Sequence, residues 1–151
     1  MQVYDQSLQE FGSERYPWLD QNEQRLEAEQ DFYLYLRDFL RPKDSIIAVW
    51  EDEGSYVSAL RLEAYRDGVL IEGLETLPYH RQKGYAINLL KAVLLYLEGI
   101  HCRRVYSHIH KKNIPSIRTH LSCGFDCLLD YSVYIDGSVD NYSYTYMKEI
   151  P

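Results

Sequence analysis

The chain has 151 residues, of which 46% are hydrophobic and 26% are charged, and its formal net charge is −7. This length and balance fit one globular domain over residues 1–151 with a single core. The sequence contains neither a basic N-terminal segment followed by an apolar stretch nor an apolar run of about 18 residues, so we expect a cytoplasmic protein.

The first 44 residues carry the weakest signals. Residues 1–4 fit an edge strand, and residues 16–20 fit a turn with an aromatic anchor. From Asn22 to Leu40 the spacing of apolar residues predicts a helix with one apolar side. That side would consist of Leu26, Phe32, Tyr33, Leu36, Phe39 and Leu40. Pro42 ends the pattern, because the residue before a proline disfavours the helical conformation.

Three strand-like runs follow, over residues 45–50, 55–62 and 69–77. Turn signals separate them, of which Asp67-Gly68 is typical of a hairpin. An antiparallel meander should therefore lead into residues 78–84.

A helix over residues 86–98 is expected after this loop, with Gly99 as its stop. The strand-like run at 103–110 could then lie parallel to its predecessor, because a helix makes the crossover. Asn113 is a good N-cap for a short helix that ends before Gly124. Two final strands, 125–135 and 141–150, are expected around the turn at 136–137.

The cysteines, Cys102, Cys123 and Cys127, are an odd and sparse set that argues against a disulfide framework. His108 and His110 could be combined with Cys123 and Cys127 into a metal site, but their spacing differs from the specific zinc motifs. We therefore expect buried thiols, strand histidines and no metal.

The loop before the 86–98 helix has the composition of an anion site. Arg81 and Gly84 precede a helix N-terminus, whose first N–H groups lack partners inside the helix. Gly84 lets the backbone approach a ligand closely, and Ala86 keeps a second contact point small. Residues 80–120 contain eight lysines and arginines but only one acidic residue, Glu98. This balance suits an anionic ligand, although each charge alone equally fits a solvated face.

Two motifs together carry a resemblance to a known family. The segment Arg81–Ala86, with the pattern Arg-x-x-Gly-x-Ala, resembles the pyrophosphate-binding motif of the GNAT superfamily of acyl-CoA-dependent N-acyltransferases. The segment Asn113–Phe125 resembles the second GNAT motif, but His120 stands where that motif often has a tyrosine. The resemblance implies an α/β (α+β) fold. Its central, mostly antiparallel mixed sheet splays between the fourth and fifth strands and is flanked by helices.

The resemblance also implies an N-acetyltransferase that moves an acetyl group from acetyl-CoA to a primary amine. Backbone groups of Gln82–Ala86 would hold the pyrophosphate, while Thr76, Leu77 and Asn113 would bind the pantetheine arm. The full set of implied cofactor-binding residues is Thr76, Leu77, Arg81, Gln82, Lys83, Gly84, Tyr85, Ala86, Asn113 and Ser116.

The catalytic candidates are Glu75, His120 and Tyr146. Glu75 could take the amine proton through a water, hold a cationic substrate, or be an exposed strand carboxylate. His120 could protonate the leaving thiolate, make a structural hydrogen bond while Tyr146 or Tyr85 acts as the acid, or face solvent. The histidines of the 103–110 strand are weaker candidates for the base.

The sequence does not identify the acceptor. The acidic first half, with 17 acidic and 7 basic side chains in residues 1–75, favours a small cationic or peptide amine. Glu23, Glu27 and Asp31 would line the acceptor side, although such a stripe is more often a solvated helix face.

Two other function classes stay open: a non-catalytic acyl-CoA sensor, and a protein-interaction module that uses Trp18 and the tyrosine-rich strands. We expect neither nucleic acid nor a membrane among the partners, and a homodimer is one option for the assembly.

Overall fold

The computed structural model describes residues 2–42 and 44–151. The helical elements are η1 (Gln2–Tyr4), α1 (Asp5–Arg15), α2 (Gln21–Phe39), η2 (Pro78–His80), α3 (Tyr85–Gly99) and α4 (Ile114–Ser122). The strands are β1 (Ile46–Asp52), β2 (Ser55–Tyr65), β3 (Gly68–Thr76), β4 (Arg104–His110), β5 (Asp126–Leu129), β6 (Ser132–Val133), β7 (Val139–Asp140) and β8 (Ser143–Glu149). In the part of the chain that the structure describes, no helix combines the length and apolar character needed to cross a membrane.

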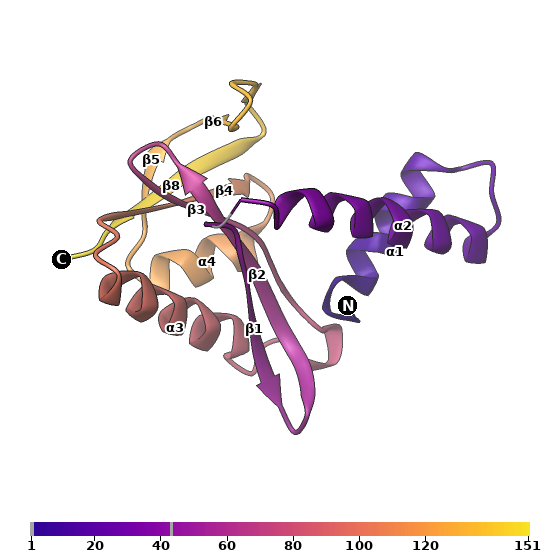
Figure 1. Ribbon diagram of the computed structural model, residues 1–151, viewed down its shortest axis with the longest axis horizontal. Coiled ribbons are helices and arrows are strands. Elements are labelled where there is room, and N and C mark those ends of the chain that lie inside the picture. The colour runs from indigo at the N-terminus through magenta and orange to yellow at the C-terminus, as the bar shows by residue number, and fades with distance from the viewer. Residues whose placement is uncertain (1, 43) are drawn as a thin grey trace.

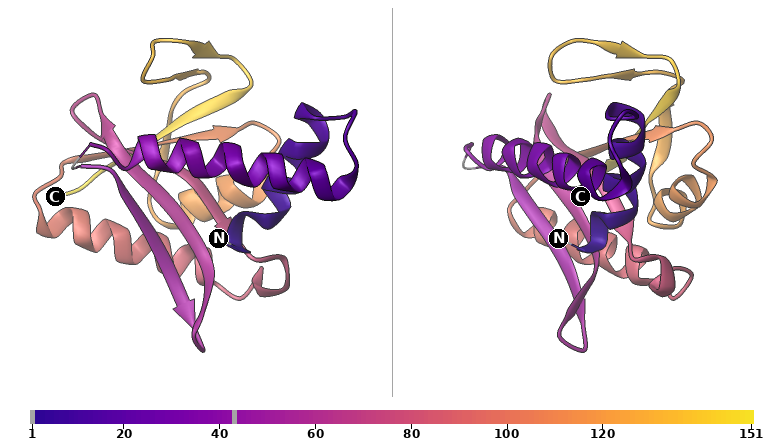
Figure 2. Two further views of the ribbon diagram at one scale, coloured as in Figure 1. Left: turned by 45° about the vertical axis from the view of Figure 1, so that its right-hand side comes forward. Right: turned by 90° about the vertical axis from the view of Figure 1, so that its right-hand side faces the viewer.

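Six strands form one mixed sheet in the order β1-β2-β3-β4-β8-β5, and β6 pairs separately with β7. All neighbouring strands are antiparallel except β3 and β4, which α3 connects as a parallel pair. Helices α1 and α2 lie together on one side of the sheet, whereas α3 and α4 lie on the other (Figures 1 and 2). The expected fold class is therefore confirmed.

Strands β3 and β4 diverge before β3 ends. Their parallel pairing covers Val69–Ile71 on β3 and Val105–Ser107 on β4, and it stops there. This is the splay that the resemblance implies. It lies between the third and fourth strands of this chain, because residues 2–4 form a 3-10 helix where the sequence predicted an edge strand. Met1, the first residue of that predicted strand, lies outside the described residues.

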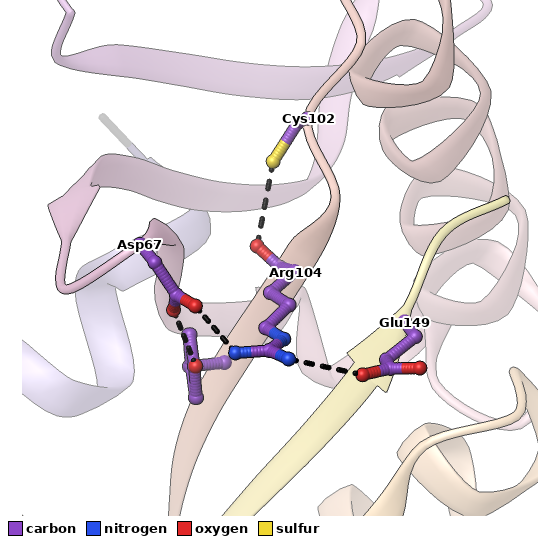
Figure 3. Close-up of polar contacts among 5 residues, drawn as sticks. Asp67, Cys102, Arg104 and Glu149 are labelled. Carbon is purple, nitrogen blue, oxygen red and sulfur yellow. Dashed lines mark hydrogen bonds and ion pairs between the residues drawn. The ribbon is translucent and has the colours of Figure 1, made fainter.

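A polar cluster joins the strands at the end away from the splay (Figure 3). Arg104, at the start of β4, pairs with Asp67 in the β2–β3 turn and with Glu149 of β8. The hydroxyl of Tyr106 donates to the second carboxylate oxygen of Asp67 at 2.7 Å. The ion pairs are exposed and each contributes little stability. Together they connect three strands where β3 and β4 are still paired.

The main hydrophobic core lies between the sheet and α3. The buried face of this helix consists of Leu89, Leu90, Val93, Leu94 and Leu97. It packs against buried residues of the sheet that include Leu60, Ile71 and Val105. Burying one such aliphatic side chain contributes about 1.5–3 kcal/mol. This packing fixes α3, and with it the position of its N-terminus.

The N-terminal region is helical and has a smaller core of its own. Val3, Tyr4 and Leu8 pack against Ala28 of α2 and Ala59 of β2. The predicted turn at residues 16–20 is confirmed by a hydrogen bond from the Leu19 N–H to the Tyr16 carbonyl, at 3.1 Å. Of its two aromatic residues, Tyr16 attaches the turn to α2 by donating its hydroxyl hydrogen to Asp31, whereas Trp18 is 74% exposed.

Helix α2 occurs where the sequence predicts a helix, but its buried side is different. Ala28 and Phe39 are buried, whereas Leu26, Tyr33 and Leu40 of the predicted apolar side are exposed. The helix packs mainly against α1, where Gly12 lies against Ala28, and reaches Tyr4 and Ala59 through Ala28 and Phe32. Four of its eight apolar residues therefore stay exposed: Leu26, Tyr33, Leu34 and Tyr35.

Two predictions also need correction, one about the end of helix α3 and one about the final strand pair. Gly99 is the last helical residue of α3, and the left-handed conformation falls at His101, with φ 60°. Gly124 does take the predicted left-handed position after α4, with φ 82°. The predicted final strand pair is divided: β5 and β8 join the main sheet, while β6 and β7 form a hairpin around the turn at 136–137.

Candidate active site

A cavity of about 640 Å³ lies where β3 and β4 diverge. Its walls come from the end of β3, the loop and first turn of α3, the end of β4, one face of α4 and the first half of α1. The lining residues fall within segments 6–10, 71–87, 107–110 and 113–120. The cavity therefore brings both sequence motifs together with α1, which carried no motif.

The loop end of the cavity is formed by backbone in the left-handed conformation. Gln82 has φ 59° and Gly84, the N-cap of α3, has φ 84°. In the described chain, no side chain caps this helix, so its first N–H groups keep their partial positive charge. A Cβ built on Gly84 would meet no atom within 4 Å. An open, uncapped helix start is suited to phosphate oxygens.

The two basic residues of the loop behave differently. Arg81 donates from Nε to the Thr76 carbonyl at 3.0 Å, and from Nη2 to Gln6 Oε1 at 2.8 Å. It therefore ties the loop to β3 and to α1. Lys83 is exposed and lies outside the cavity lining.

Two backbone groups assigned to the pantetheine arm already have partners. The N–H of Leu77 donates to the Val57 carbonyl at 2.9 Å, and the Thr76 carbonyl accepts from Arg81. The Thr76 hydroxyl also lies 3.0 Å from that of Ser58. Pairing of the arm with residues 76 and 77 stays a prediction.

Glu75 reaches the cavity because β3 contains a bulge. Two residues, Gly73 and Leu74, lie opposite one residue of β2, and Gly73 has φ 57°. Simple alternation predicts Glu72 and Glu75 on opposite faces of the strand. The extra residue turns both toward the α1 and α2 side, since a bulge shifts the alternation by one. Leu74 instead packs against the α3 core.

The carboxylate of Glu75 is held by α1. Ser7 donates from its hydroxyl to Glu75 Oε1 at 2.7 Å. Burial raises the pKa of Glu75, and the negative charge of Glu10 adds to this, while the Ser7 hydrogen bond and the charges of Arg61 and Arg81 oppose it; the net shift is upward. A partly buried carboxylate with a raised pKa is a suitable proton acceptor near neutral pH.

Arg61 is a neighbour of this site that the sequence did not indicate. Its guanidinium carbon lies 5.5, 5.9 and 5.3 Å from the ring centroids of Tyr4, Phe32 and Tyr35. A Cβ added to Gly73 would come within 2.5 Å of Arg61 Nη1. These aromatic faces, from η1 and α2, stabilise the Arg61 cation beside the bulge. An arginine inside a strand pattern gives no signal for such a position.

An acidic pair occupies the same side of the sheet, outside the cavity lining. Burial, and then the charge of Glu72, raise the pKa of Glu63 to about 7. Glu63 therefore takes up a proton at slightly acidic pH.

His120 lies on the inner face of α4 and is 1% exposed, which excludes the solvent-facing interpretation. Its Nδ1 is 2.8 Å from the Ser116 carbonyl oxygen, and a carbonyl only accepts, so Nδ1 carries the hydrogen. Nε2 is buried and has no hydrogen-bond partner among the described residues. Burial lowers the pKa of His120, which favours the neutral ring at pH 7.

The two tyrosines considered as acids are engaged elsewhere. Tyr85 lines the cavity, but its hydroxyl donates to the Asp52 carboxylate. Tyr146 is buried in the main core and lies outside the cavity lining. Asn113 caps α4, because its Oδ1 accepts from the Ser116 N–H at 3.2 Å. Asn113 and Ser116 both line the cavity, as the predicted cofactor roles require.

The histidines of β4 line the opposite wall. His108 lies between the rings of Tyr65 and Tyr134, with centroid distances of 5.4 and 5.3 Å. Burial lowers the pKa of His108 to about 4, so this ring is neutral. His110 accepts from the Lys112 N–H at Nδ1, at 3.1 Å.

Within residues 2–42 and 44–151, no group of three or more His, Cys, Asp or Glu side chains is arranged to hold a metal ion. The expectation of buried thiols is right for Cys123 and wrong for Cys127, which is exposed.

The acidic stripe predicted on α2 does not reach the cavity. Glu23 completes a capping box with Asp20, and Asp31 accepts from the Tyr16 hydroxyl at 2.5 Å. Glu27 is exposed. The acceptor wall is instead built by three residues of α1, namely Gln6, Ser7 and Glu10.

Solved structures with the same fold include several acetyltransferases. The ribosomal-protein-S18-alanine N-acetyltransferase from Escherichia coli is 15% identical with a TM-score of 0.62, over 77% of this chain and 76% of that one. The IAA acetyltransferase from Bacillus cereus is also 15% identical with a TM-score of 0.62, over 77% of this chain and 83% of that one. A candidate streptothricin acetyltransferase from Bacillus anthracis, solved in complex with acetyl coenzyme A, is 11% identical with a TM-score of 0.62, over 76% of this chain and 67% of that one. At these identities the likeness shows the fold alone.

No curated protein matches the sequence. A family model does match residues 5–125, and it is that of the acetyltransferase (GNAT) family. The matched region runs from the start of α1 to the residue after Gly124, so it contains every segment that lines the cavity. It also covers well over half of the chain. The protein therefore belongs to the acetyltransferase (GNAT) family.

Proposed function

We propose that this protein is an N-acetyltransferase that transfers an acetyl group from acetyl-CoA to the primary amine of a small cationic or peptide acceptor. One observation carries the proposal: a single cavity joins the uncapped start of α3 to the diverging ends of β3 and β4 and to the carboxylate of Glu75. Family membership supports an acyltransferase with acetyl-CoA as its co-substrate.

The residues at the loop end fit coenzyme A. The first N–H groups of α3 and the open space beside Gly84 would receive the pyrophosphate. Asn113 and Ser116 would contact the pantetheine arm from α4, opposite the edge of β3. When bound, the co-substrate supplies an acyl group activated as a thioester.

The acceptor would enter from the α1 side. An alkylammonium must lose a proton before its nitrogen can attack a carbonyl carbon. Glu75, held by the Ser7 hydroxyl, takes this proton directly or through a water. Glu10 and Glu75 together favour a cationic amine at this end, because both carboxylates border the cavity. As the new N–C bond forms and the C–S bond breaks, the nitrogen loses a further proton and the leaving sulfur gains one, so the products are the amide and the free thiol.

A non-catalytic acyl-CoA sensor is the second candidate. One observation favours it: the hydroxyl of Tyr85 is bonded to Asp52, and Tyr146 lies in the core. Neither tyrosine is thus placed to protonate a leaving thiolate.

The test is a panel of amines mixed with acetyl-CoA and the purified protein, with thiol release followed by a thiol-reactive dye. The panel contains polyamines, aminoglycosides, amino-acid amines and peptides with free N-termini. Amine-dependent thiol release supports the enzyme. Calorimetric binding of acetyl-CoA without turnover on any amine favours the sensor. Absence of acetyl-CoA binding contradicts both and leaves the protein-interaction module.

A further inference from the structure

The buried Nε2 atom of His120 is an acceptor without a donor. The hydrogen bond to the Ser116 carbonyl fixes the ring hydrogen on Nδ1, so Nε2 presents a lone pair. Buried polar atoms in proteins nearly always have a hydrogen-bond partner. Because His120 lines the cavity, a bound ligand can supply the missing donor.

The position of His120 limits which part of a ligand reaches it. Asn113, at the start of α4, is exposed, whereas His120 is buried and lies about 10 Å further along the helix, at 1.5 Å per residue. The Phe125 ring stands edge-on at 5.1 Å and closes one side of the imidazole with carbon atoms. A donor must therefore come from the cavity, at its buried end on the α4 side.

The chemistry of the two cofactor forms differs at this end. The sulfur of an acyl thioester carries no hydrogen, whereas the free thiol of coenzyme A carries one and is a weak donor. A neutral imidazole nitrogen accepts such a hydrogen, and it offers nothing to the thioester sulfur. We propose that His120 Nε2 accepts a hydrogen bond from the thiol of free coenzyme A, so that the site distinguishes the product cofactor from its acylated form.

This inference rests on the proposed function, because it requires coenzyme A in the cavity. It assigns His120 a role opposite to that of a proton-donating tyrosine at the same motif position. Free coenzyme A is then retained by the site and competes with acetyl-CoA. The rate of acetylation would follow the ratio of the two cofactors.

The experiment is calorimetric titration of the full chain with coenzyme A and with desulfo-coenzyme A, in which hydrogen replaces the thiol. The wild type should bind coenzyme A about fivefold more tightly, within the roughly twofold to twelvefold range of one hydrogen bond. In His120→Asn the amide nitrogen can keep the bond to the Ser116 carbonyl while Nε2 is lost, so the ratio should fall to about 1. His120→Gln, which restores a polar atom near Nε2, should recover part of the preference.

Ser122→Ala, an exposed change on the same helix, is the control and should keep the wild-type ratio. Equal binding of both ligands by the wild type overturns the inference without any variant, so it does not depend on how the variants fold. Equal weakening of both ligands by His120→Asn also overturns it, because Nε2 then meets an amide of the arm. If the wild type binds neither ligand, the proposed function itself fails.

Discussion

The two ends of the cavity are built from different kinds of atoms. At the loop end the surface consists of backbone N–H groups and the turn at Gly84, whereas at the α1 end it consists of the side chains of Ser7, Glu10 and Glu75. A backbone surface survives most substitutions, provided the turn keeps its conformation. A side-chain surface changes with each substitution. We therefore expect the α1 end to determine the acceptor and the rate, and the loop end to determine cofactor affinity alone.

The largest effect is expected from Glu75→Gln. This change keeps the shape of the side chain but removes the proton acceptor, so kcat should fall by about 100-fold, the low end of the range for general-base catalysis. Affinity for acetyl-CoA, measured by calorimetry, should stay within about twofold. A variant with wild-type kcat would show that Glu75 is not the base, and a parallel loss of acetyl-CoA affinity would break the separation between the two ends.

Gly84→Ala should produce the complementary result. Gly84 has φ 84°, and a non-glycine residue in this conformation costs about 1–3 kcal/mol. Relief of that strain distorts the turn, so affinity for acetyl-CoA should fall by about tenfold or more. Gly137→Ala is a matched control, because Gly137 has φ 83° and lies in the β6–β7 hairpin, outside the cavity lining. Equal affinities in the two variants would show that the Gly84 turn does not form the phosphate site.

Ser7→Ala should shift the pH dependence of the reaction. The Ser7 hydroxyl lowers the pKa of Glu75, against the stronger effect of burial that raises it. Without the hydroxyl the pKa of Glu75 rises further. The base acts in its ionised form, so the rate should begin to fall at a higher pH as the solution is acidified.

The measurement for Ser7→Ala is kcat/KM for the amine across the acidic limb. Ser13→Ala, an exposed change in the same helix, serves as the control. An acidic limb that stays in place would remove Glu75 from the pH-determining step.

The smallest effect is expected from a comparison of one carboxylate on α1 with one on α2. Glu10→Gln removes a carboxylate that lines the cavity, so KM for a cationic acceptor should rise by about threefold, as expected for one partly solvated charge. Glu27→Gln removes the exposed α2 carboxylate and should leave KM unchanged. Steady-state kinetics with one cationic amine compares the two variants. A larger rise in KM for Glu27→Gln than for Glu10→Gln would show that α2, and not α1, forms the acceptor wall.

The loop, α3 and α4 could be predicted because their signals are local. Gly84 at a helix start, the regular apolar face of α3 and the Asn113 cap depend on residues close together in the chain. Helix α1 has no such signal. Its apolar side chains do not form one buried face, because Leu8 is buried while Phe11 is 44% exposed. The helix is therefore stabilised by packing against α2 and the sheet, which a local pattern does not reveal.

Contacts between residues far apart in the chain, including hydrogen bonds, could not be predicted from the sequence either. Arg81 could be predicted near a phosphate site, but its bond to Gln6 joins residues 75 positions apart. Tyr146 alternates as expected on its strand, yet its side chain lies in the main core and outside the cavity lining. Burial lowers the pKa of His120 against the opposing effect of its bond to the Ser116 carbonyl, and only the folded chain supplies that burial, with the Phe125 ring at 5.1 Å.

Because of the bulge at Gly73, one extra residue in β3 determines the face of the sheet on which Glu75 lies. Before it, Leu70 and Glu72 point to the α1 and α2 side, and after it Glu75 does, so the even-odd pattern reverses within one strand. If the same residues paired with β2 without the bulge, regular alternation would turn the Glu75 carboxylate into the apolar layer under α3, where an unpaired charge is costly. An insertion or deletion in an exposed turn leaves this phase intact. The register of one residue thus determines whether this strand carries an active-site acid or only a hydrophobic core.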